Sequence, residues 1–135
     1  MSSIIDKIKD IPNLYHATGC TTSQLKEAQK ELGIEFSNEY IDYVKEYGAI
    51  SFYRTEWTGL NVDSYLNVVE VTKQERELNS KFPSDCFVIE NQGIDGLIVI
   101  SDEKGVIYNF QYDNKEFLCE NLDSYLEMCI LRKKK

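Results

Sequence analysis

Residues 33–60 read GIEFSNEYIDYVKEYGAISFYRTEWTGL, and this stretch decides the fold of the chain. It holds one helix whose two ends are marked by particular residues. Ser37 is a preferred N-cap, Phe36 before it can act as a hydrophobic staple, and Gly48 can end the helix. After Gly48 the period of the apolar residues changes from that of a helix to that of a strand, which predicts a strand over Ile50–Arg54.

The segment before this stretch predicts two further helices. Isoleucines between positions 4 and 11 recur at helical spacing, and Pro12 stops that short helix. Thr21 and Gln24 have the spacing of a capping box, which begins the next helix. Gly33 is placed to end that helix in a left-handed turn.

The segment after this stretch predicts mainly strands. The expected strands are Val68–Val71, Cys86–Glu90, Leu97–Ser101 and Val106–Tyr112, the last two as a hairpin. A charged helix is expected over Thr72–Lys81, with Leu78 as its apolar anchor, and Asn121 is expected to cap a last helix. Helices, then antiparallel strands, then a closing helix indicate an α+β domain.

Length and composition favour one globular domain. The chain has 135 residues, of which 42% are hydrophobic, and this suffices for a proper core. We expect a single domain with an N-terminal helix and loop (1–20), a core (21–131) and a basic tail (132–135). No apolar run is long enough for a membrane span, and the N-terminus resembles neither a signal nor a transit peptide. The expected location is the cytoplasm, where the four cysteines would be buried free thiols.

The charge is strongly negative and unevenly distributed. The net charge is -8, and residues 85–127 hold ten Asp or Glu against two Lys. Such a field repels phosphate backbones and anionic lipid, which disfavours nucleic-acid and membrane binding. It attracts a basic protein partner, although acidity can equally serve solubility alone.

No catalytic, metal-binding or cofactor motif is present. His16 is the single histidine and has no nucleophile motif beside it. Phosphate-loop, dinucleotide, zinc-protease and nucleophile-elbow patterns are absent, and the cysteines lack zinc-site spacing. We therefore expect neither a metal nor a cofactor, and no enzyme.

Aromatic and acidic residues alternate around residues 40–65, which favours a protein-binding role. Aromatic residues are enriched at the energetic centres of interfaces. Some must belong to the core instead, and the expected core members are Tyr40, Tyr47 and Phe52. Tyr43 is expected to be exposed, and Trp57 fits a core position and an interface equally well.

Several segments resemble the SUKH superfamily, which includes the yeast cell-wall regulator of the Smi/Knr type and many bacterial immunity proteins. The resemblance covers about residues 21–130. It rests on TTSQLKEAQKELG, FSNEYIDYVKEYG, the loop NQGIDG and the closing helix NLDSYLEM. Many members carry Leu-Pro where this chain has Phe36-Ser37, and a serine cap does the same physical work.

The resemblance implies a non-catalytic α+β domain that neutralises a bacterial toxin, often a nuclease. Nuclease domains tend to be basic, which agrees with an acidic inhibitor. An adaptor for an endogenous protein remains the alternative. Composition and position, rather than the family, suggest the partner contacts Tyr43, Glu46, Tyr53, Glu56, Trp57, Asp63, Tyr65, Asn91 and Asp95.

Overall fold

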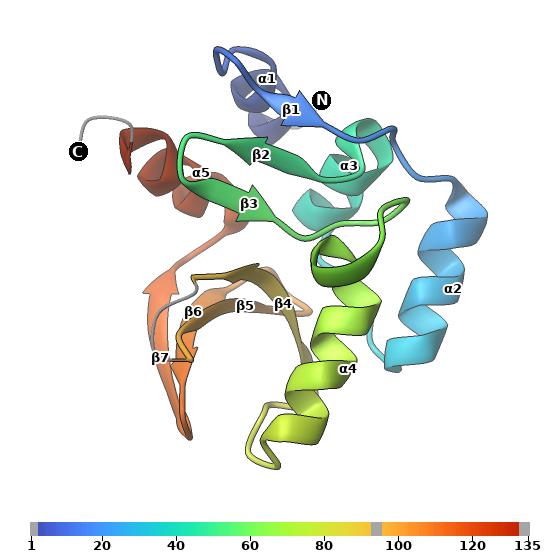
Figure 1. Cartoon of the computed structure of the whole chain (residues 1–135), viewed down its shortest axis with the longest axis vertical. Helices are drawn as coiled ribbons and strands as arrows, with labels where there is room; N and C mark the ends of the chain where they lie inside the picture. The colour runs from blue at the N-terminus through green and yellow to red at the C-terminus, as the bar shows by residue number, and fades with distance from the viewer. Residues whose placement is uncertain (1–2, 93–95, 133–135) are drawn as a thin grey trace.

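The computed structural model describes residues 3–92 and 96–132. Within these residues, two antiparallel sheets and five α-helices form an α+β fold (Figure 1). The helices are α1 (Ser3–Lys9), α2 (Thr22–Leu32), α3 (Asn38–Tyr47), α4 (Val68–Leu78) and α5 (Leu122–Leu131), with a short 3-10 helix η1 (Ser64–Leu66). The strands are β1 (Tyr15–His16), β2 (Ile50–Phe52), β3 (Thr55–Trp57), β4 (Cys86–Asn91), β5 (Ile98–Asp102), β6 (Ile107–Gln111) and β7 (Asn114–Cys119). The predicted fold class is confirmed.

Hydrogen bonds at the helix ends follow the predicted caps. The Thr21 hydroxyl accepts from the Gln24 amide at 3.0 Å, while the Gln24 side chain accepts from the Thr21 amide at 2.8 Å. Gly33 ends α2 with a left-handed φ of 69°. Ser37 and Asn121 cap α3 and α5. Each of the three N-caps stabilises its helix by about 1 kcal/mol.

Helix α4 begins four residues earlier than predicted, so the expected strand Val68–Val71 is wrong. The Asn67 side chain accepts hydrogen bonds from two amides of the first turn, at 2.9 and 3.1 Å. This cap and the burial of the valines outweigh their weak helix propensity. The buried residues of α4 lie in its first turns. Leu78 is 72% exposed, so it is not the expected apolar anchor.

The sheets are a small one, β1-β2-β3, and a larger one, β4-β5-β6-β7. Figure 1 shows α2 and α4 side by side at one edge of the molecule, with α1, α3 and α5 around the small sheet. The main core lies between the helices and both sheets, and it includes isoleucines of α1. A second, smaller core covers the opposite face of the larger sheet. None of the helices in residues 3–92 and 96–132 has the length and apolar character to span a bilayer.

Tyr43 lies in the main core and is 0% exposed, which corrects the prediction that it is a surface contact. The buried face of α3 follows the spacing 40, 43, 44 and 47, and Tyr43 falls inside that stripe. Its hydroxyl donates to the Thr58 carbonyl at 2.7 Å and accepts from the Ile50 amide at 3.1 Å. The hydroxyl is therefore satisfied inside the protein and unavailable to a partner.

Trp57 is also 0% exposed, so it is a core residue and not a partner contact. It pairs across the small sheet with buried Ile50. Its ring stacks on Tyr125 at 5.9 Å and meets the edge of Tyr43 at 5.3 Å. The predicted core residues Tyr40, Tyr47 and Phe52 are buried as expected.

Candidate partner-binding surface

Two of the predicted contacts, Glu56 and Tyr65, lie side by side on the surface. The Tyr65 hydroxyl donates a hydrogen bond to Glu56 Oε2 at 3.2 Å. Strand register places Tyr15 opposite Ser51, and Ser51 opposite Glu56. Because opposed residues share one face of a sheet, these three form an outer row across the small sheet. Tyr15 is 78% and Tyr65 66% exposed.

A small apolar dimple of about 130 Å³ adjoins the outer row, where β1 and β2 meet the connecting loop (residues 61–66). It has room for about four water molecules, or for the apolar stem of one side chain. Tyr15 and Ser51 of the outer row contribute to its wall. The other lining residues are His16, Ala17, Ala49, Ile50, Val62 and Leu66.

Asn61 fixes the connecting loop in place. It adopts a left-handed φ of 63°, which asparagine tolerates better than most residues. Its side chain accepts from Gln24 Nε2 at 3.2 Å and donates to the Thr18 carbonyl at 3.1 Å. Asn67 donates to the Val62 carbonyl at 3.0 Å. A loop tied down in this way loses little further entropy when it binds a partner.

An acidic groove of about 780 Å³ runs between α2 and α4, beside the connecting loop. Its charged lining residues are Glu27, Glu31, Asp63 and Glu70, and within residues 3–92 and 96–132 no Lys or Arg lines it. Glu31 is paired at 3.3 Å with Lys73, an exposed contact that contributes little. The apolar lining residues are Ala28, Leu60, Val62 and Val69.

Val62 lines both the dimple and the acidic groove, so the two hollows are neighbours on the surface. Three predicted contacts lie in this region: Asp63 lines the groove, Glu56 belongs to the outer row beside the dimple, and Tyr65 is hydrogen-bonded to Glu56. Sequence reasoning missed Tyr15, because the two residues of β1 give no periodic signal. It also missed Glu27, although the spacing 24, 27, 28 and 31 on α2 marks one helical stripe.

The remaining predicted contacts are not placed on this surface. Glu46 is exposed at the end of α3. Tyr53 lines a separate hollow of about 280 Å³ beside residues of α1 and α5. Asn91 is exposed at the end of β4. Asp95 lies outside the described residues.

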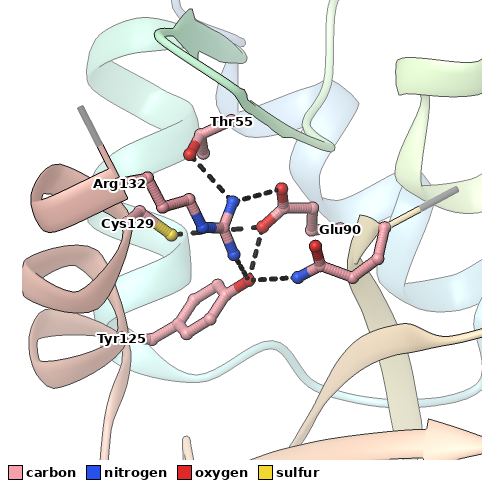
Figure 2. Close-up of polar contacts among 6 residues, drawn as sticks. Thr55, Glu90, Tyr125, Cys129 and Arg132 are labelled. Carbon is pink, nitrogen blue, oxygen red and sulfur yellow. Dashed lines mark hydrogen bonds and ion pairs between the residues drawn. The ribbon is translucent and has the colours of Figure 1, made fainter. Parts of the chain in front are cut away.

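A buried polar network lies behind the small sheet (Figure 2). Glu90 of β4 is 2% exposed and receives hydrogen bonds from the Tyr125 hydroxyl and from Arg132 Nη1, the latter at 2.8 Å. Arg132 also donates to the Thr55 hydroxyl at 2.9 Å and to the Tyr125 oxygen at 3.0 Å. Gln92 donates to the same tyrosine oxygen at 3.2 Å. The network joins β3, β4 and the end of α5.

The nucleophilic groups of this network are held in their protonated forms. Burial raises the pKa of the Cys129 thiol to about 11. Burial likewise raises the pKa of Tyr125 well above its ordinary value, and the charge of Glu90 adds to the effect. A protonated thiol is a poor nucleophile, so this arrangement suits structural support. In the described part of the chain, no group of three His, Cys, Asp or Glu is arranged to hold a metal ion.

Comparison with protein families places the chain in a known family. A family model described as "SUKH_5: SMI1-KNR4 cell-wall" matches residues 1–131. A search of curated proteins finds no match. The family model spans nearly the whole chain, including all the elements that build the dimple, the acidic groove and most of the buried network. The chain therefore belongs to the SUKH family, which includes immunity proteins.

Proposed function

We propose that this chain is an immunity protein that binds a cognate bacterial toxin in the cytoplasm and blocks it by occupying its active surface. The toxin domain is a basic nuclease. The acidic groove between α2 and α4 carries this proposal, because four carboxylates line it and, among the residues that the structure describes, no basic residue does. The family supports the proposal, since it includes immunity proteins and its members are generally non-catalytic.

Electrostatics explain how such a groove would block a nuclease. A nuclease holds the phosphate backbone with Lys and Arg side chains. Carboxylates fixed on a protein surface can pair with the same side chains and so exclude the nucleic acid. The net charge of -8 adds long-range attraction, which speeds the encounter at low salt.

The buried network is consistent with binding rather than catalysis. Its thiol and phenol are protonated at neutral pH, and its charges are paired within the fold. Its contribution is to hold β3 against β4 and α5, which keeps the small sheet and its outer row rigid. Rigid surfaces bind with a lower entropy cost.

Co-expression tests the proposal. Cells that produce the toxin domain encoded beside this chain should grow when the wild-type chain is present. The double variant Glu27→Lys and Glu70→Lys should fail to protect them, because it reverses the groove charge at two exposed positions. The matched control Glu116→Lys and Glu120→Lys makes the same change in net charge at exposed residues of β7 and just beyond it, and should still protect.

Failure of the wild-type chain to restore growth contradicts the proposal. Recovery of an endogenous protein with the chain, from cells with no toxin gene beside it, would instead favour the adaptor role.

A further inference from the structure

The dimple combines an apolar lining with a carboxylate at its edge. Ser51 lines the dimple and lies directly opposite Glu56 on the neighbouring strand. Opposed residues have Cβ atoms about 5 Å apart. A side chain whose stem fills the dimple can therefore bring a cationic end group to Glu56.

Glu56 is oriented by its neighbour without being neutralised. Tyr65 donates one hydrogen bond to it at 3.2 Å, and within residues 3–92 and 96–132 Glu56 forms no ion pair. The charge on Glu56 is also the main reason why the pKa of Tyr65 is raised. The Glu56 carboxylate is thus held in place beside the apolar dimple without a cationic partner among the described residues.

We propose that the dimple is the anchoring site for one arginine side chain of the protein partner. The methylene stem of this arginine lies in the dimple, and its guanidinium binds Glu56 and stacks on Tyr15. This inference rests on the proposed function, because it names the residue type by which the toxin is held.

Arginine fits this site better than lysine. Its planar guanidinium presents paired donors to a carboxylate and stacks on aromatic rings, whereas an ammonium group is compact and strongly hydrated. Tyr15 is 78% exposed and offers such a ring at the rim. Arginine and tyrosine are also among the residue types enriched at the energetic centres of interfaces.

A pair of small probes tests this site without the toxin. N-acetyl-arginine methylamide is titrated into the full ¹⁵N-labelled chain, up to a concentration of about 10 mM, which detects weak binding. N-acetyl-citrulline methylamide has the same shape without the charge. The arginine probe should shift the backbone amide signals of Ala17, Ser51 and Leu66, and the citrulline probe should not.

Three variants at exposed positions locate the interaction. Glu56→Gln should weaken binding of the arginine probe by about threefold, the size expected for one exposed ion pair. Tyr15→Ala should weaken it comparably. The matched control Glu46→Gln removes the same charge at the end of α3 and should bind as the wild type does. Equal affinity of wild type and Glu56→Gln, or shifts spread evenly over the acidic groove, would overturn the inference.

The toxin domain separates this inference from the proposed function. If the toxin binds wild type and Glu56→Gln equally, the arginine site is wrong and the proposed function stands. If the toxin does not bind the wild type while the arginine probe still shifts the dimple amides, the proposed function fails and the arginine site stands.

Discussion

Glu90 of β4 and Arg132 at the end of α5 form an ion pair inside the protein, with 2.8 Å between Glu90 Oε2 and Arg132 Nη1. The side chain of Glu90 is 3% exposed and that of Arg132 is 23% exposed. Removing charged groups from water is costly, so each partner depends on the other. The pair fixes the last helix against both sheets.

Replacing Arg132 by Met should lower the free energy of unfolding by about 2–3 kcal/mol, because it leaves the Glu90 carboxylate buried without a counter-charge. The loss is below that of a fully buried pair, since Arg132 remains partly solvated. Urea denaturation measures it. The control Arg54→Met changes an exposed arginine in the β2–β3 turn and should stay within about 0.5 kcal/mol of wild type. Equal stability of both variants would contradict the role of the pair.

Replacing Trp57 by Ala should destabilise the fold by about 3–5 kcal/mol, as expected for removing a large buried aromatic side chain. Tyr65→Ala, at an exposed aromatic of the candidate partner-binding surface, should leave stability almost unchanged and weaken partner binding. Thermal and urea denaturation compare the two. A Trp57→Ala variant as stable as wild type but defective in binding would show that the indole faces the partner instead.

Stability should fall as the pH rises from about 9 to 11, because buried thiols keep their protons only in the folded state. Burial raises the pKa of Cys129 to about 11 and that of Cys86 to about 12, from an ordinary value of 9.0. In this window the unfolded chain loses protons that the folded chain retains, so the free energy of unfolding decreases. Each thiol contributes a slope of up to about 1.4 kcal/mol per pH unit.

Denaturant melts at pH 8, 9, 10 and 11 test this dependence, and Cys129→Ala should reduce the slope. A free energy of unfolding that stays constant or rises across this window would contradict the burial of the thiols.

Neutralising the acidic groove should slow association with the toxin domain. The double variant Glu27→Gln and Glu70→Gln should lower the association rate constant by about tenfold at low salt, while the dissociation rate changes less. The difference should shrink as salt screens the charges. Stopped-flow measurements at several salt concentrations provide the test. A rate constant unaffected by these changes would place the toxin on another surface.

Local hydrogen bonding explains which parts of the fold the sequence could predict. The caps at Thr21, Ser37 and Asn121 each depend on residues within three positions, so their side chains specify helix starts directly. Asn67 follows the same rule, since its side chain accepts two amide hydrogen bonds from the first turn of α4. The run of valines after it favours a strand by propensity, and tertiary packing overrides this preference.

Contacts between distant segments explain what the sequence could not predict. Glu90 and Arg132 are 42 positions apart, and nothing local marks them as partners. An acid within the apolar strand CFVIE was a signal that a buried counter-charge exists. The candidate surface likewise combines residues that the sequence can predict with one that it cannot. Local composition predicts Glu56 and Tyr65 as contacts, whereas Tyr15 joins them only through strand pairing.

The most direct test is a titration of the purified nuclease toxin domain with the purified chain, with nucleic-acid cleavage as the readout. Inhibition by occupancy predicts that activity falls in proportion to the added chain and ends at an equimolar amount, with a stable complex in size-exclusion chromatography. Two results would contradict the claim that this protein acts by binding alone. One is complete loss of toxin activity when the chain is present at far less than one molecule per toxin, and the other is full toxin activity in an excess of the chain.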